Sequence, residues 1–551
     1  MPKIVLEHVT KRWGGFYAVD DLNLVMEDSS FITLLGPSGC GKTTTLRMIA
    51  GLETPTSGKI TIGDHVVFDS NAGINVPASK RKVGFLFQNY ALWPNMTVYQ
   101  NISFGLKNVK EEMPLYQEDY LEHLHIANAL SRPKDIVKCV KDTVDKDGKI
   151  NNKRAIAHLI DLLDLTERET KAVFALHLEE ASEPDKIAEE AAAKEREKAE
   201  AIKANVEKNG TTIGPKGELL KNREVVMKKR HLTSEEIDLA VRRSSRVVKI
   251  GEFMDRYPSE LSGGQQQRVA IARTLAPKPA VLFMDEPLSN LDAKLRLEMR
   301  AELQRLHRDL GATFVYVTHD QLEAMTLATR ICLINNGVLQ QYEPPLQVYK
   351  TPHNMFVADF VGNPSINFVE VRGSQEADGS FSFTGLNGVK FRFHPASPFS
   401  CAAWQSEERQ KEEAKQKEKA NDASTRGFVE KSNKDALFHY HINKVDEDAV
   451  EEEYTPDEHD FVLGIRPEAM QIHEGEDGTK SIKGKIYSAM PTGMETTIRV
   501  NVNGYLLTGV IFGASSFALD EAVEIHLSGS SIMLFERKSQ QFMTLGSLTL
   551  E

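Results

Sequence analysis

Short apolar runs alternate with longer amphipathic segments through the first two thirds of the chain. Four runs have the length and apolar character of buried strands: FITLL at 31–35, VGFLF at 83–87, VLFM at 281–284 and TFVYV at 313–317. Runs of this kind, separated by helix-like segments, are typical of a parallel sheet covered by helices. We therefore predict an α/β domain over residues 1–363.

The last third changes to strict alternation of apolar and polar residues. Residues 496–502 and 505–511 alternate in this way, and the dipeptide Asn503-Gly504 separates them. Asn-Gly between two such runs is a strong signal for a two-residue β-hairpin. We predict an all-β domain over residues 364–551.

Two charged stretches interrupt these patterns. Residues 183–208 are rich in Ala, Glu and Lys, with Glu190 and Lys194 spaced i,i+4, which predicts a solvated helix or a coiled pair. Residues 406–426 are similarly charged and predict a loop or an exposed helix. The first stretch lies in an insertion at about 110–230, which is either a tolerated surface excursion or a docking arm for the membrane, a permease or another protein. The second stretch lies in an insertion at about 405–435.

Composition narrows the class of protein. A chain of 551 residues exceeds what one core usually serves, so we expect two or three domains. No apolar run reaches the roughly 18 residues of a membrane span, and the start lacks the features of a signal peptide. Four scattered cysteines form no CxxC pair. The net charge of −12 argues against nucleic acid as the main partner. We expect a cytoplasmic protein.

The first strand run leads directly into a phosphate-binding motif. GPSGCGKT matches GxxxxGK[ST], in which glycine amides converge on phosphate oxygens at the start of a helix. The lysine brings charge to the terminal phosphates, and the following hydroxyl binds Mg²⁺. The predicted nucleotide contacts are Gly36, Pro37, Ser38, Gly39, Cys40, Gly41, Lys42, Thr43 and Thr44.

Polar residues follow the other three strand runs. Asp285 and Glu286 end one, Gln88 follows the second and His319 the third. The carboxyl ends of parallel strands share one edge of a sheet, where ligands bind. Asp285 is predicted to hold Mg²⁺, Glu286 to polarise the attacking water, Gln88 to orient metal or water, and His319 to contact the γ-phosphate. Any one of these residues alone is typical of an ordinary loop.

The order of these motifs, with LSGGQ at 261–265 between them, resembles the ATPase subunit of ABC transporters. LSGGQ is the signature of that family. The resemblance implies that Ser262, Gly263, Gly264 and Gln265 contact the ATP of a partner subunit, so that two subunits enclose two nucleotides. It also implies that Trp13 stacks on adenine, although a core tryptophan is the alternative.

Longer stretches resemble the importer branch that serves sugar and glycerol-phosphate uptake. These include NYALWPNMTVYQNISFGL at 89–106 and FVADFVGNPSINF at 356–368. The motif GIRPE, at 464–468, resembles a strand end in the OB-like C-terminal domain of that branch. In the family, such a domain packs against its copy and can carry regulation; the sequence leaves both roles open.

The resemblance implies a set of partners and a place in the cell. These are a second ATPase subunit, a membrane permease and, indirectly, a solute-binding protein, with this chain at the cytoplasmic face of the membrane. The permease is expected to contact Tyr90, Leu92, Trp93 and Met96; the alternative is that these four side chains only pack internally. A soluble ABC ATPase acting on ribosomes or DNA is the alternative. A non-hydrolysing scaffold is disfavoured because Lys42 and Glu286 are both present.

Overall fold

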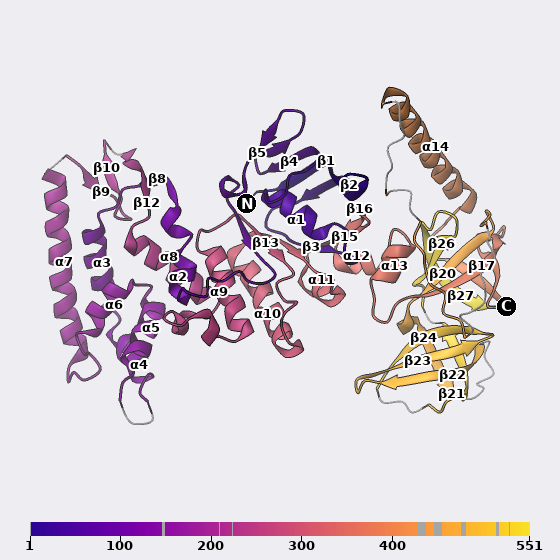
Figure 1. Cartoon of the computed structure of the whole chain (residues 1–551). Coiled ribbons are helices and arrows are strands. Elements are labelled where there is room, and N and C mark those ends of the chain that lie inside the picture. The colour runs from indigo at the N-terminus through magenta and orange to yellow at the C-terminus, as the bar shows by residue number, and fades with distance from the viewer. Residues whose placement is uncertain are drawn as a thin grey trace. The chain divides into compact units, whose positions relative to one another are not determined.

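The computed structural model describes residues 2–145, 149–208, 210–222, 224–426, 433, 437–445, 455–474, 481–513, 517–527 and 529–551. It contains two compact units, residues 82–314 and residues 2–81 with 315–551 (Figure 1). Strand β14 (Thr313–Val317) includes the boundary between them. The predicted domains, 1–363 and 364–551, are continuous in sequence, unlike these two units, and the division at residue 363 stays a prediction.

The unit of residues 82–314 is mainly helical. Strands β7 (Val83–Leu86) and β13 (Val281–Asp285) pair in parallel, and every residue of β13 is buried. The flanking helices are α2 (Val98–Ser103), α8 (Ser234–Val247), α9 (Gly263–Leu275) and α10 (Ala293–Leu310).

The insertion predicted at about 110–230 is a small helical body. It contains β8 (Lys110–Pro114), α3 (Glu118–Ala129), α4 (Pro133–Lys141), α5 (Asn152–Leu163), α6 (Glu167–Phe174), α7 (Pro184–Lys208), β9 (Thr212–Ile213), β10 (Leu219–Lys221), β11 (Glu224–Val225) and β12 (Met227–His231). Residues 146–148, 209 and 223 of this insertion lie outside the described residues.

Helix α7 confirms the helix predicted over residues 183–208, but it is not solvated on all sides. Ala188, Ala192 and Ala199 are buried, and α7 lies along α3 (Figure 1). Alanine lets two helices approach closely because it adds little volume beyond the backbone. The charged residues occupy the remaining faces.

The second unit begins with an antiparallel sheet in the order β2-β1-β4-β5-β6. It continues with strands β15 and β3, which pair in parallel, while β16 joins β15 antiparallel and β14 lies next to β3. The elements are β1 (Ile4–Trp13), β2 (Phe16–Met26), β3 (Phe31–Leu35), α1 (Lys42–Ala50), β4 (Ser57–Ile62), β5 (His65–Asp69), β6 (Ile74–Asn75), α11 (Gln321–Leu327), β15 (Arg330–Asn335), β16 (Val338–Glu343), α12 (Pro345–Lys350) and α13 (Met355–Phe360).

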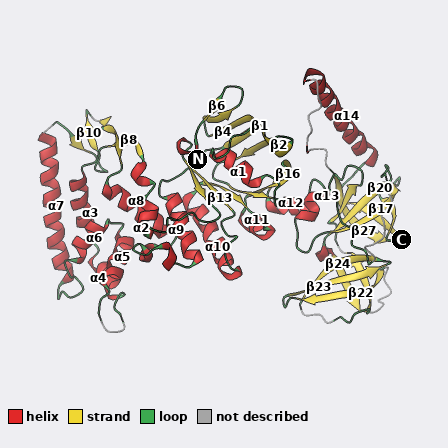
Figure 2. Cartoon of the chain, viewed as in Figure 1, coloured by secondary structure: helices red, strands yellow, loops and turns green. Residues whose placement is uncertain are grey.

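The tail of this unit is built mainly of strands, with the long helix α14 (Cys401–Arg426) inserted between β19 and β20 (Figure 2). Six strands close a barrel in the order β17-β18-β19-β27-β26-β20, and five form the sheet β21-β25-β22-β23-β24. Their bounds are β17 (Asn367–Gln375), β18 (Phe381–Gly385), β19 (Val389–Pro395), β20 (Asp460–Ile465), β21 (Met470–Glu474), β22 (Ile482–Pro491), β23 (Glu495–Val502), β24 (Tyr505–Phe512), β25 (Ala522–Leu527), β26 (Ile532–Glu536) and β27 (Phe542–Leu550).

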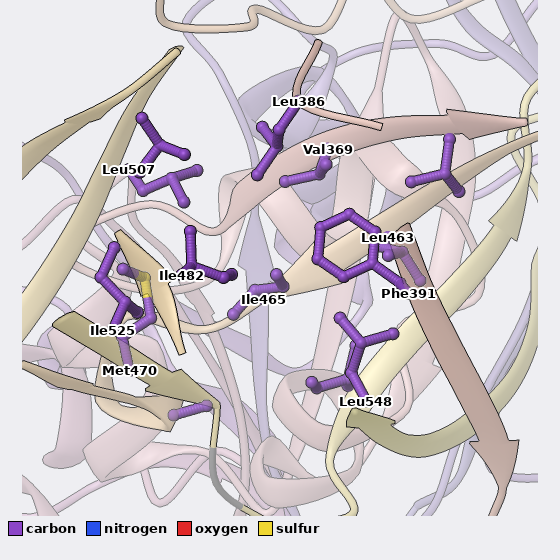
Figure 3. Close-up of a cluster of buried hydrophobic side chains, with 14 of the residues drawn as sticks. Val369, Leu386, Phe391, Leu463, Ile465, Met470, Ile482, Leu507, Ile525 and Leu548 are labelled. Carbon is purple, nitrogen blue, oxygen red and sulfur yellow. The ribbon is translucent and has the colours of Figure 1, made fainter. Parts of the chain in front are cut away.

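The predicted all-β, OB-like tail is confirmed, including its hairpin. Strands β23 and β24 pair antiparallel with Val502 opposite Tyr505, so that Asn503 and Gly504 make the turn. One continuous core joins the barrel and the five-stranded sheet: Leu463 and Phe391 belong to the same buried cluster as Ile525 (Figure 3).

The charged stretch from residue 406 forms part of helix α14 (Cys401–Arg426), which is one of the two predicted alternatives. Residues 427–432 and 434–436 of the predicted insertion lie outside the described residues. Among the helices of the described chain, none is both long enough and apolar enough to cross a membrane.

Candidate functional site

The phosphate loop lies between β3 and α1, as predicted. All five residues of β3 are buried, and α1 begins at Lys42. Gly36 and Gly41 have φ angles of 150° and 103°, and a Cβ at either would lie 2.1 Å from a backbone carbonyl oxygen, that of Ile334 or Ala18. Only glycine fits at these two positions, because any side chain would overlap the backbone packed behind the loop.

The side chain of Lys42 points into the loop. It is buried, and its Nζ donates hydrogen bonds of 2.7 Å to the carbonyl oxygens of Gly36 and Pro37. The Sγ atom of Cys40 lies 3.8 Å from the same nitrogen, and burial raises the pKa of this thiol. The loop therefore surrounds one positive charge, while Ser38 and Gly39 are exposed to solvent.

Replacing Gly41 with alanine tests how tightly the loop is packed. Gly41→Ala is expected to lower the melting temperature well beyond Gly39→Ala. Both glycines have positive φ, with a strain cost of about 1–2 kcal/mol for alanine, but a Cβ at position 39 meets open space. Thermal denaturation of the two variants isolates the contact with Ala18; equal melting temperatures would contradict it.

His319 follows β14 close to the start of the phosphate loop. The backbone N–H of Thr318 donates to the carbonyl of Leu34 at 3.2 Å. The hydroxyl of Thr318 is bonded to Glu323 and to the amide of Asp320, which holds the backbone on either side of His319. The imidazole itself is exposed. The structure thus brings the strand end with His319 to the end of β3 that carries the loop.

Trp13 ends β1 and is 51% exposed, which excludes the alternative of a core tryptophan. Phe16 is its cross-strand partner, and the two ring planes are inclined by only 5° with centroids 6.5 Å apart. The Nζ atom of Lys11 lies 5.3 Å from the centroid of the Trp13 ring. An exposed aromatic face of this kind suits stacking on a base.

Gln88 and Glu286 lie together in the other unit. Met284 of β13 pairs with Leu86 of β7. Glu286 comes two residues after Met284, and Gln88 comes two residues after Leu86, so the two polar residues follow the same end of the two strands. The amide Nε2 of Gln88 donates to Glu286 Oε2 at 3.3 Å. Glu286 has a φ of 45°, an uncommon value for a residue other than glycine, and such values concentrate at functional sites. Asp285, one residue earlier, is buried.

Several residues that sequence reasoning missed hold this region in place. Arg273 of α9 donates hydrogen bonds of 2.6 Å to the carbonyls of Tyr90 and Ala91, two consecutive residues with positive φ. The buried Asn101 bonds to both backbone groups of Trp93 and to the carbonyls of Met96 and Thr97. No local pattern marks Arg273, because its two partners lie more than 180 positions earlier in the chain. The partners of Asn101 lie four to eight positions before it, but nothing in that short segment marks this asparagine as the residue that binds them.

The signature residues Ser262 and Gln265 cap helix α9. The Ser262 hydroxyl accepts from the amide of Gln265, whose side chain accepts from the amide of Ser262. Gly263 is exposed, whereas Gly264 is buried, and a Cβ there would lie 2.6 Å from Leu295 Cδ2 of α10. The glycine at 264 therefore serves packing between α9 and α10, in addition to any role of its amide.

The residues predicted to hold Mg²⁺ are distributed over the two units. Asp285 and Gln88 belong to residues 82–314, and Thr43 to the unit with the phosphate loop. Carboxylate, amide and hydroxyl oxygens are the hard donors that Mg²⁺ prefers, and a buried carboxylate such as Asp285 is stabilised by a cation. The donor set therefore fits this metal.

A separate cavity of about 630 Å³ lies where the insertion meets helix α8. Its lining includes Glu169 and Glu236, each of which closes a capping box with the threonine three residues earlier, Thr166 and Thr233. Glu236 also forms an ion pair with Arg230. Because the carboxylates of Glu169 and Glu236 already bind groups of the protein, they do not indicate which class of ligand the cavity would take.

Comparison with known proteins places these features in a family. The model of the family described as "ABC transporter" matches residues 19–289. The trehalose/maltose import ATP-binding protein MalK of Thermococcus litoralis is 36% identical over 370 residues, 67% of each chain. The xylose/arabinose import ATP-binding protein XacJ of Haloferax volcanii is 37% identical over 67% of this chain and 63% of its own.

Two further similarities are to another relative and to a solved structure. The sn-glycerol-3-phosphate import ATP-binding protein UgpC of Brucella abortus is 34% identical over 67% of this chain and 70% of its own. Among solved structures, the dimeric bacterial ABC transporter cassette MJ0796 is similar with a TM-score of 0.35 and 21% identity, covering 62% of this chain and 98% of that one.

This chain belongs to the ABC transporter family, as one of its ATP-binding proteins. It is an ATPase of the ABC type, and its cofactors are ATP and Mg²⁺. The resemblance predicted from the order of the motifs is confirmed.

Proposed function

We propose that the protein is the ATP-hydrolysing subunit of an importer that takes up a sugar or glycerol phosphate through a separate membrane permease. The observation that carries the proposal is the contact between Gln88 and Glu286 at the ends of two paired parallel strands. Phosphoryl transfer to water needs a positioned carboxylate more than a nucleophilic side chain, and this pair supplies one.

Each site residue has a defined part in hydrolysis. The amides of the phosphate loop and Lys42 bind the phosphates, and Trp13 stacks on the adenine. Thr43, Asp285 and Gln88 would hold Mg²⁺, which would supply positive charge to the phosphates. Glu286 accepts a proton from the attacking water.

His319 and Asn290 have supporting parts in hydrolysis. His319 donates to the γ-phosphate from the strand end beside the loop, and the carbonyl of Gln88 is fastened by the side chain of Asn290 at 3.0 Å. Restricting Gln88 in this way keeps its amide directed at Glu286, which favours a single orientation of the water.

A second subunit supplies the remaining contacts. The exposed Ser262 and Gly263 stand at the start of α9, where helix amides favour an anion. The relatives are import ATP-binding proteins by name, which supports a complex with a permease at the cytoplasmic face of the membrane. Trp93, half exposed and packed against Phe104 with centroids 5.5 Å apart, is a suitable contact for a permease helix.

Isolation of the native complex tests the transport assignment. The tagged protein, purified from gently solubilised membranes, is expected to retain membrane-spanning permease subunits that mass spectrometry identifies. A Lys42→Ala variant, which lacks the charge at the centre of the loop, should retain the same partners but bind ATP at least tenfold more weakly. Recovery of only soluble partners, such as ribosomal proteins, would contradict the transport assignment and favour a soluble ABC ATPase.

A further inference from the structure

One residue of the tail's charged insertion contacts the region behind the phosphate loop. The backbone N–H of Asn433 donates to Asp20 Oδ2 at 2.8 Å. Its side-chain Nδ2 donates to the carbonyl oxygens of Tyr17 at 3.1 Å and Asn336 at 2.7 Å. Asn433 thus links strand β2 to the turn between β15 and β16 from a distant part of the chain.

Strand β2 and the turn between β15 and β16 both support the phosphate loop directly. The backbone N–H of Gly337, next to Asn336, donates to the carbonyl of Cys40 at 2.9 Å. The N–H of Asp20 donates to the carbonyl of Gly337 at 2.9 Å. The carbonyl of Ala18, next to Tyr17, is the atom that leaves no room for a Cβ at Gly41. A shift of β2 or of this turn would therefore move the loop.

The chemistry of asparagine suits this position. Its amide group offers two N–H donors, and here both carbonyl partners are acceptors. The carboxylate of the buried Asp20 receives the backbone donor, a charge-assisted bond. A carboxylate in place of the amide would face two carbonyl oxygens with no proton to donate.

Residues 437–445, which follow Asn433, contact both helix α13 and the β-rich tail. The Phe438 ring packs edge-on against Phe356 of α13 with centroids 5.3 Å apart. The side chain of Gln540 bonds to both backbone groups of Phe438, at 2.9 Å and 2.7 Å. Farther on, the N–H of Leu506 in β24 donates to the carbonyl of Asn443 at 2.8 Å. Residues 437–445 therefore connect α13 with the five-stranded sheet of the tail.

We propose that Asn433 is a positioning residue for ATP binding, through which the tail insertion holds the phosphate loop in its binding geometry. The inference rests on the proposed nucleotide site at that loop. Holding β2 and the 336–337 turn together in advance removes an ordering cost that ATP would otherwise meet on binding. The chemical step, which depends on residues of the other strand ends, does not need Asn433.

Steady-state ATPase kinetics on the full chain test this assignment. Asn433→Asp is expected to raise the KM for ATP about five- to tenfold and Asn433→Ala about two- to threefold, with kcat within a factor of two in both. Asn387→Asp is the matched control, because Asn387 also donates its side-chain amide to a backbone carbonyl, that of Asn503, at 3.0 Å but inside the tail. It carries the same change of charge and should leave KM unchanged.

The outcomes separate this inference from the proposed function. An unchanged KM for ATP in Asn433→Asp overturns the positioning role. A fall of kcat as large as the rise in KM, together with a lower melting temperature, also overturns it, because that result indicates a purely structural contact. Direct titration of Lys42→Ala with ATP tests the nucleotide site itself: undiminished binding there overturns the proposed function, whatever the result at Asn433. A raised KM at normal kcat, with ATP binding lost in Lys42→Ala, supports both.

Discussion

A Glu286→Gln variant is expected to hydrolyse ATP at least a hundredfold more slowly than the unmodified protein while still binding it. The amide keeps the size and most of the contacts of Glu286, including the approach of Gln88 at 3.3 Å, but it cannot accept a proton from water. General bases typically contribute a factor of 10² to 10⁴. The substitution therefore removes the chemical step and leaves the binding residues in place.

In the proposed two-subunit arrangement hydrolysis separates the subunits, so the same variant should accumulate as an ATP-bound dimer. Size-exclusion chromatography with and without Mg-ATP measures this directly, and Glu298→Gln, an exposed carboxylate on α10, is the control for the loss of one charge. Failure to dimerise even with the permease present would contradict the two-site arrangement. Undiminished hydrolysis would mean that another group is the base.

The local structure that the sequence patterns predicted depends on residues that are close together in the chain. The phosphate loop needs a strand, glycines with unusual φ and a helix start within about a dozen residues, and all of these can be recognised in the sequence around Gly36 and Gly41. The hairpin at Asn503-Gly504 is equally local, since a two-residue hairpin turn strongly favours this dipeptide.

What the sequence did not reveal depends on contacts between distant segments. Arg273 holds Tyr90, and Asn433 holds Tyr17, from more than 150 positions away. A single arginine or asparagine in a helix or a charged stretch looks like an ordinary surface residue. Gly264 illustrates the converse: a motif predicted a role toward phosphate, whereas only the fold shows that a Cβ there would lie 2.6 Å from Leu295 Cδ2.

Replacing Arg466 with methionine is expected to lower the free energy of unfolding substantially. Arg466, in the GIRPE motif at the end of β20, is buried and donates hydrogen bonds to the carbonyls of Ala358, Val361 and Tyr349. Its guanidinium also lies 4.1 Å from the centroid of the Tyr349 ring. These contacts join the β tail to α12 and α13, and burial lowers the pKa of this arginine.

Methionine fills much of the volume of the side chain but donates nothing, so the buried carbonyls of Ala358 and Val361 and the partly buried carbonyl of Tyr349 lose their hydrogen bonds from Arg466. With about 1–3 kcal/mol for each buried group left unsatisfied, and partial relaxation, we expect a loss of about 3–5 kcal/mol in the free energy of unfolding. Arg466→Lys should recover only part of it, because an ammonium cannot reproduce the planar set of donors.

Arg409→Met is the matched control. Arg409 is exposed on α14 and pairs with Glu458 at 2.8 Å, and an exposed pair contributes at most about 1 kcal/mol. Calorimetry should show a lower melting temperature for Arg466→Met alone, and hydrogen exchange should locate the faster-exchanging amides in α12, α13 and β20. Equal melting of the two variants would contradict this role, because the buried arginine would then contribute no more than a solvent-exposed ion pair.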